Sequence, residues 1–231
     1  MLMITLTGDY AIVSAKITHK IMRIIYYKLS PGQISQTQEV HWLAELPVVK
    51  QQQIQRLPNR SDRLASLIGL QLTKLAAGLS GVDDFMLQEI RFDLRSKPRS
   101  PLPVDFSISH SGDLVACAFS TDCRVGLDVE KIRPVHERLY RRYCNAEEQR
   151  RIRQDKDVFF DFWTMRESVL KAVGASLFED IANIRIDDET ATLHETTWQL
   201  NMLALEPDYR ACLATDCVAP DMIIEQLNTL E

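Results

Sequence analysis

The stretch that most constrains the fold is residues 161–174, DFWTMRESVLKAVG, whose spacing predicts a helix with apolar surface on nearly every side. Trp163, Glu167 and Lys171 recur every four residues, so they share one face of this helix. A helix of this kind is mostly buried, and each of its charges therefore needs a partner. Taken alone, the stretch favours an internal Glu167–Lys171 ion pair over a functional role.

The size and charge of the chain describe an ordinary globular protein. It has 231 residues, of which 45% are hydrophobic and 26% charged, enough for one large domain or two small ones. The formal net charge of −5 does not suit a nucleic-acid partner. The first twenty residues lack the features of a signal peptide, and no membrane span is predicted. We therefore expect a cytoplasmic protein.

The cysteines predict neither a disulfide framework nor a zinc site. They are odd in number and form no CxxC pair and no zinc-like cluster with histidine. We expect reduced thiols at all five positions, which are 117, 123, 144, 212 and 217.

The order of predicted elements indicates an α+β protein made of two similar halves, each with a helix and about three strands. We expect a pseudo-twofold arrangement with the active cleft between the halves. The predicted elements are, in chain order, a strand at 22–29, helices at 41–46, 48–56 and 61–79, strands at 86–92, 105–109, 114–120 and 124–131, basic helices within 136–156, the helix at 161–174, and strands at 181–187, 197–203 and 209–215, with 222–230 a strand or a helix.

The two halves are predicted to be residues 22–122 and 123–231. Met22 stands at the head of the first strand. Residues 1–21 are therefore either part of the first half or an N-terminal extension before an alternative start. Two similar halves in one chain can form a cleft without a second subunit, so we expect a monomer.

An alternating strand at residues 124–131, RVGLDVEK, carries two acids on one face. Asp128 and Glu130 lie about 7 Å apart along that face and repel each other unless a cation lies between them. Gly126 leaves room there for a close approach. Alone, the strand is more often a charged edge facing solvent. Together with Glu167, it indicates a site for Mg²⁺ or Mn²⁺ rather than zinc, because no histidine or cysteine cluster is nearby.

Four motifs in this order resemble those of the Sfp-type 4′-phosphopantetheinyl transferases. Residues 125–130 (VGLDVE) and 163–171 (WTMRESVLK) are similar to the family's (V/I)G(I/V/L)D(I/V/L)E and W-x-x-K-E-(A/S)-x-x-K signatures, with a similar separation of about 35 residues. Residues 106–111 (FSISHS) are similar to its F-N-x-S-H-(S/T) segment, and Lys97-Pro98 to its G-K-P. Each motif is moderately specific, and four in the right order are highly specific. The resemblance covers roughly residues 63–174.

The resemblance implies an enzyme that transfers the 4′-phosphopantetheine arm of coenzyme A to a serine of an apo carrier protein, acyl, peptidyl or aryl, and releases 3′,5′-ADP. By this match Asp128, Glu130 and Glu167 are the Mg²⁺ ligands. Glu167 also orients or deprotonates the serine hydroxyl. Lys171 neutralises a phosphate oxygen as the bond to the leaving group breaks.

The same match assigns the residues that hold coenzyme A. Arg63 and His110 are expected to contact the 3′-phosphate, with Lys171 on another phosphate. Lys97, Pro98 and Ser109 are expected to line the adenine-ribose site. Without the resemblance, His110 is ordinarily an exposed turn residue and Arg63 a surface arginine. The basic residues at 50, 56 and 60 are further candidates for the 3′-phosphate.

The chain departs from the family pattern at two positions. Ser96 replaces a glycine, and Arg166 replaces the lysine before Glu167. Arginine keeps the charge but not the geometry or the ability to transfer a proton. Arg166 therefore favours an alternative, a non-catalytic module of the same fold that binds coenzyme A or a nucleotide. The basic run at residues 138–153 is either a docking surface for an acidic carrier protein or a solvated helix face.

Overall fold

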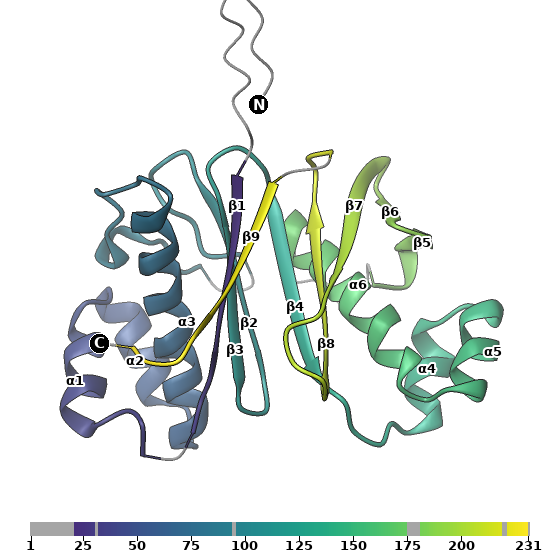
Figure 1. Cartoon of the computed structure of the whole chain (residues 1–231), viewed down its shortest axis with the longest axis horizontal. Helices are drawn as coiled ribbons and strands as arrows, with labels where there is room; N and C mark the ends of the chain where they lie inside the picture. Colours follow the sequence, from purple (N-terminus) through teal and green to yellow (C-terminus); the bar gives the residue numbers. More distant parts are fainter. Residues whose placement is uncertain (1–20, 31, 94–95, 175–180, 219–220, 231) are drawn as a thin grey trace, which may run out of the picture.

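Two β-sheets meet at the centre of the molecule, and helices cover their outer faces (Figure 1). This computed structural model describes residues 21–30, 32–93, 96–174, 181–218 and 221–230. The strand order is β2-β3-β1-β9 in the first sheet and β4-β8-β7-β6-β5 in the second. Neighbouring strands are antiparallel except β1 and β9, which are parallel. The predicted α+β class is confirmed.

The elements up to the end of the first sheet's hairpin are β1 Ile21–Lys28, α1 Gln36–Ala44, α2 Val48–Gln55, α3 Arg60–Leu79, η1 Leu87–Glu89, β2 Asp105–Ser111 and β3 Leu114–Ser120. The elements that follow are β4 Val125–Lys131, α4 Glu137–Tyr143, α5 Ala146–Gln154, α6 Val158–Val173, η2 Ile181–Asn183, β5 Arg185–Asp187, β6 Thr190–Leu193, β7 Thr196–Leu203, β8 Tyr209–Thr215 and β9 Asp221–Leu227.

Two predicted elements differ from the structure, and one strand was not predicted. The strand predicted at 86–92 is a 3₁₀ turn, because Leu87 and Ile90 are buried three residues apart, which suits a turn of helix better than an alternating strand. The strand predicted at 181–187 divides into η2 and the short β5. A further strand, β6, forms a hairpin with β5. Its side chains alternate between exposed and buried.

The last strand returns to the first sheet. β9 runs alongside β1 with Met222 opposite Met22, so the segment at 222–230 that was predicted as a strand or a helix contains a strand. The chain thus passes between the sheets twice, from β3 to β4 and from β8 to β9. Residues 221–227, which belong to the second half of the predicted division, thus pair with the first sheet. The expected extension at residues 1–21 lies, apart from Ile21, outside the described residues.

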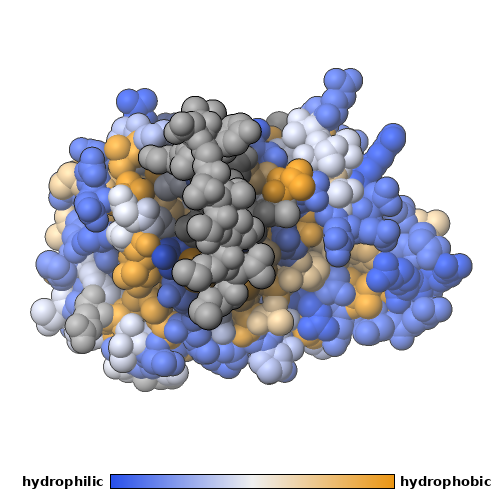
Figure 2. Space-filling view, turned by 45° about the horizontal axis from the view of Figure 1, so that its top comes forward, coloured by the Kyte–Doolittle hydropathy of each residue, from blue (hydrophilic) through white to orange (hydrophobic). Residues whose placement is uncertain are grey.

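Each sheet has one helix packed along its outer face. α3 buries a stripe of apolar residues against the first sheet, and α6 packs on β4 and β8 of the second. The inner faces pack against each other through fully buried side chains such as Ile24, Leu127 and Leu213. Each large apolar side chain so buried contributes about 1.5–3 kcal/mol to folding. No helix among the described residues is long and apolar enough to cross a membrane. Figure 2 shows hydrophilic side chains over most of the end that carries the second sheet.

Side chains, rather than a backbone ladder, join β2 to β4. Four alternating residues of β2, Asp105, Ser107, Ser109 and Ser111, accept hydrogen bonds of 2.8–3.1 Å from four alternating backbone N–H groups of β4. The donors, in order, are the N–H groups of Val125, Leu127, Val129 and Lys131. The four N–H groups on the edge of β4 that does not face β8 are therefore satisfied, although no strand in the described part of the chain pairs with this edge.

One cysteine pair is oxidised, which corrects the expectation of five reduced thiols. Cys123 and Cys217 form a disulfide with their Cα atoms 5.7 Å apart. Cys123 lies in the β3–β4 connection and Cys217 in the β8–β9 connection, so the bond ties together the two places where the chain passes between the sheets. The other three cysteines, Cys117, Cys144 and Cys212, are free and buried.

Reduction of this disulfide is expected to lower the melting temperature. The bond closes a loop with a sequence separation of 94, for which the chain-entropy model gives about 4–5 kcal/mol of stabilisation. Thermal unfolding followed by circular dichroism, with and without dithiothreitol, measures the change. The Cys123→Ser/Cys217→Ser double variant serves as the control and should melt at the same temperature in both buffers. Equal melting of the wild-type protein in both buffers would contradict the prediction.

Candidate active site

The site forms where α6 lies directly against β4. A Cβ atom on Gly126 would lie 1.9 Å from the Ser168 carbonyl oxygen and 2.4 Å from the Ala172 nitrogen, so only glycine permits this approach. The close packing brings Lys171 of α6 to Asp128 of β4. Gly174, with a φ angle of +78°, then ends the helix, and its N–H donates to the Leu170 carbonyl.

Lys171, Asp128 and Ser109 form a buried polar cluster. The Lys171 Nζ donates to Asp128 Oδ1 at 2.7 Å and to Ser109 Oγ at 2.8 Å, and Ser109 Oγ donates to Asp128 Oδ1 at 3.0 Å. The Asp128 residue is only 5% exposed. The ion-pair partner of Lys171 is thus Asp128. The internal Glu167–Lys171 pair that the helix alone favoured is not formed.

Two carboxylates at the cluster keep oxygen atoms without a hydrogen-bond partner among the described residues. Asp128 Oδ2 is buried and has no hydrogen-bond partner, and the Glu167 carboxylate bonds to no described residue. Burial raises the pKa of Asp128, although Lys171 opposes the shift. Burial first, and the charge of Asp128 second, raise the pKa of Glu167 to about 7. Both groups are therefore poised to accept a cation or a hydrogen-bond donor.

The third carboxylate, Glu130, is held at the edge of the cluster. Its Oε2 accepts hydrogen bonds of 2.9 Å from Ser111 Oγ and from Arg133 Nη1. In the described part of the chain, the three carboxylates do not all lie within 4.8 Å of one another, since a group that tight forms only around the disulfide. The oxygen-only donor set and the unpartnered Asp128 Oδ2 nevertheless fit a hard divalent cation.

A cavity of about 410 Å³ opens beside the cluster, between α6 and the first half of the chain. Its lining includes Lys50, Phe92, Lys97, Pro98, His110, Glu167, Leu170 and Lys171. The Lys50 Nζ lies 5.0 Å from the centroid of the Phe92 ring. Burial lowers the pKa of Lys50, and burial followed by the charge of Lys171 lowers that of His110. Cationic and hydrogen-bonding groups around an apolar wall suit a phosphorylated ligand with a flat ring.

Most of the predicted ligand-binding residues line this cavity, but the polar group of Lys97 is already bonded within the protein. Pro98 and His110 line it. Lys97 also lines it, yet its Nζ donates to Asp105 at 2.5 Å and to the Val125 carbonyl at 2.6 Å, so its charge holds β4 in place. Ser109 is not among the lining residues and instead bonds to Lys171 and Asp128.

Arg63 lies elsewhere. It donates to the Leu57 carbonyl at 2.9 Å, forms an ion pair with Glu39 at 3.7 Å, and lines a separate cavity among α1, α2 and α3. Of the three basic residues left open, Lys50 lines the site cavity, whereas Arg60 lines the same separate cavity as Arg63. The supporting role of Ser107 and Ser111 was missed, although the alternation of polar residues in DFSISHS signals it.

Arg166 points away from the cleft. Its Nη2 donates to both carboxylate oxygens of Glu148 at 2.8 Å, and its Nη1 donates to the Phe162 carbonyl at 3.2 Å. Glu148 belongs to the capping box of α5, where it also accepts from the Asn145 N–H. Arg166 and Glu148 are each 4% exposed. Arg166 therefore clamps α5 onto α6 and places no charge in the cavity.

Comparison with known proteins gives a consistent result. The sequence model of the 4′-phosphopantetheinyl transferase superfamily matches residues 124–214. The chain is 29% identical to a 4′-phosphopantetheinyl transferase of Bacillus subtilis over 68% of its own length and 73% of that protein. It is 28% identical to the 4′-phosphopantetheinyl transferase Sfp of Bacillus subtilis over 70% and 73% of the two chains. It is 30% identical to the 4′-phosphopantetheinyl transferase HetI of a Nostoc species over 64% and 67%.

Removing the Glu167 charge is expected to stabilise the metal-free protein at high pH. Because the folded-state pKa is raised from 4.5 to about 7, the folded chain binds a proton more tightly than the unfolded chain. The protein therefore loses stability as the pH rises through this range. The melting temperature of Glu167→Gln should exceed that of the wild type at about pH 8, and the excess should vanish near pH 4.5. The exposed Glu89→Gln variant should show no such trend, and a pH-independent difference for Glu167→Gln would contradict the assignment.

Proposed function

The chain belongs to the 4′-phosphopantetheinyl transferase superfamily, and from that premise we propose that this enzyme transfers the 4′-phosphopantetheine arm of coenzyme A to a serine hydroxyl of an apo carrier protein. The observation that carries the proposal is the contact of Lys171 with Asp128 beside Glu167, at the wall of a cavity that also holds Lys50 and His110. The second product is 3′,5′-ADP.

The chemistry is a displacement at the β-phosphorus of coenzyme A. The serine oxygen forms a new O–P bond, the P–O bond to 3′,5′-ADP breaks, and the serine proton goes to Glu167. A carboxylate whose pKa is raised to about 7 suits this task near neutral pH. Lys171 presents its ammonium to the oxygen that gains negative charge. Mg²⁺ or Mn²⁺ held by Asp128, Glu130 and Glu167 would neutralise the diphosphate charge.

The cavity holds the nucleotide end of coenzyme A. In this proposal Lys50 and His110 contact the 3′-phosphate, and the role expected of Arg63 passes to Lys50, which lines the cavity where Arg63 does not. The adenine-ribose part lies along Pro98 and the methylene chain of Lys97, whose ammonium is already bonded to Asp105. Phe92 offers an aromatic surface for the base.

In this proposal the enzyme acts in the cytoplasm. It acts as a monomer, because both walls of the cavity come from one chain. The non-catalytic alternative depended on Arg166. Since Arg166 bonds to Glu148 outside the cleft, its replacement of the motif lysine removes no charge from the cavity, and no described residue favours that alternative.

Loss of the Glu167 carboxylate is expected to abolish transfer. Coenzyme A, Mg²⁺ and a panel of apo acyl and peptidyl carrier proteins are incubated with the enzyme, and intact mass spectrometry records the added phosphopantetheine. Glu167→Gln should lower the rate by about 100-fold or more. Glu89→Gln is the matched control, and chelation of the metal should stop the wild-type reaction. Unmodified carriers across the panel with folded wild-type enzyme would overturn the proposed activity.

The carrier protein is proposed to dock on the basic run of α4 and α5. The Arg141 side chain is exposed, and its ion-pair partner Glu137 is an exposed residue of the same helix. Such a surface pair is weak, so Arg141 remains available to an acidic partner. Charge reversal at Arg141 and Arg142 should raise the KM for the carrier about three- to tenfold, because rim charges contribute up to about 1 kcal/mol each. The KM for coenzyme A should not change. Lys74→Glu on α3 is the control, and an unchanged carrier KM in the double reversal would remove this patch from the interface.

A further inference from the structure

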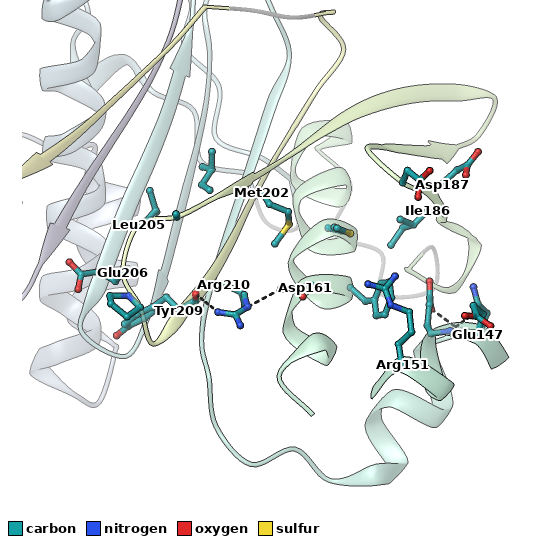
Figure 3. A pocket seen from close by; sticks show the side chains of 18 residues that line it. Glu147, Arg151, Asp161, Ile186, Asp187, Met202, Leu205, Glu206, Tyr209 and Arg210 are labelled. Atoms are coloured by element: carbon teal, nitrogen blue, oxygen red, sulfur yellow. Dashed lines mark hydrogen bonds and ion pairs between the residues drawn. The ribbon is translucent and has the colours of Figure 1, made fainter. Parts of the chain in front are cut away.

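A second cavity, of about 780 Å³, lies on the face of α6 opposite the catalytic cleft (Figure 3). Asp161, Phe162 and Met165 line it, whereas Glu167 and Lys171 line the first cavity. At 100° per residue these two sets point in opposite directions from the helix axis. The other walls come from α5, the end of β5, the end of β7 with the loop that follows it, and the start of β8.

The cavity exists because α6 covers only part of its sheet. The tight contact at Gly126 lies near the C-terminal end of α6. Toward the other end, Arg210 of β8 spans the gap to Asp161 in a 2.9 Å ion pair (Figure 3). The same face of β7 passes from the fully buried Trp198 to Met202, which is 43% exposed. Met202 thus presents an uncovered, adaptable apolar surface inside the cavity.

The apolar floor extends beyond this methionine. Other lining side chains of this kind are Phe162, Met165 and Ile186. Above the floor the cavity is acidic. Its rim includes the carboxylates of Glu147, Asp187, Asp188 and Glu206. Glu147 is paired with Arg150 at 2.5 Å and Glu206 with Lys28 at 3.0 Å. Among the described residues, the unpaired rim acids are therefore Asp187 and Asp188.

The two arginines in the lining are already engaged. Arg210 is paired with Asp161, and the Arg151 guanidinium lies 5.1 Å from the centroid of the Phe162 ring. The carboxylates of Asp187 and Asp188 have no cationic partner in the described part of the chain. Asp187 and Asp188 therefore carry negative charge that the described residues do not neutralise.

We propose that this cavity binds a short segment of a partner protein in which an apolar side chain lies between lysines or arginines. The apolar side chain covers Met202, and the cations pair with Asp187 and Asp188 at the rim. Two adjacent unpaired carboxylates match the neighbouring cations of a peptide better than a single amine. Coenzyme A and an acidic carrier surface are disfavoured here, because their charge has the sign of the rim.

Fluorescence anisotropy with a defined probe tests the site. The probe is a short fluorescein-labelled peptide with a central phenylalanine between pairs of lysines, and its control replaces each lysine by glutamate. The first variant is Asp187→Lys/Asp188→Asn, in which asparagine is chosen because residue 188 has a φ of +47°. The second is Met202→Ser. The matched controls are the exposed Asp83→Lys/Asp84→Asn and Met86→Ser.

The lysine probe should bind the wild type saturably, and coenzyme A should not compete with it. The glutamate probe should not bind. Each cavity variant should weaken binding about tenfold or more, which corresponds to about 1.4 kcal/mol, while both controls bind as the wild type does. Absence of saturable binding would overturn the proposal. Equal losses in the cavity variants and their controls, or displacement of the probe by coenzyme A, would do so as well. Neither result would bear on transfer activity, which the mass assay measures separately.

Discussion

The arrangement of the site depends on how β2 satisfies the free edge of β4. A backbone ladder between these strands would merge the two sheets into one. Asp105 and the serines of β2 instead accept the β4 N–H groups through side chains, which keeps the edge satisfied while the sheets remain separate. Two of the serines also bond to the acids, Ser109 to Asp128 and Ser111 to Glu130. The interaction that joins the halves therefore also orients the carboxylates.

The apolar circumference of α6 sets a second constraint, because it forces the charges of the helix to find partners on other elements. Lys171 reaches Asp128 on β4, Arg166 reaches Glu148 on α5, and Asp161 reaches Arg210 on β8. Of these pairs, Arg166–Glu148 has both partners buried. Breaking a buried pair by removing one partner costs about 3–5 kcal/mol, so this pair strongly favours one placement of the helix. Glu167 has no partner of this kind among the described residues. It is the carboxylate left for a ligand.

The features that could be predicted from the sequence were those set by the spacing of residues within one helix or strand. The acids of residues 125–130 and the charges of 163–171 lie within single elements, so their periodicity placed Asp128, Glu167 and Lys171 on the correct faces. What depended on distant partners was not predictable. The ion pair of Lys97 with Asp105, the disulfide across a separation of 94 and the return of β9 to β1 arise only from the tertiary fold. Arg63 was placed by a loose helical pattern, and its interactions with Leu57 and Glu39 keep it away from the site.

Both cavities follow from the contact at Gly126. Because α6 meets the sheet most closely there, Lys171 enters the cluster of Asp128, and the gap nearer the start of the helix is left to Arg210 and Met202. A larger residue at position 126 would have to push the helix from β4, since its Cβ would overlap backbone atoms rather than a flexible side chain. The two faces of α6 then differ in the sign of the charge they present. The face toward β2 borders a cavity of about 410 Å³ lined by lysines and a histidine, and the charged groups that line the cavity on the opposite face are mostly carboxylates. One helix therefore separates two cavities whose linings differ in charge.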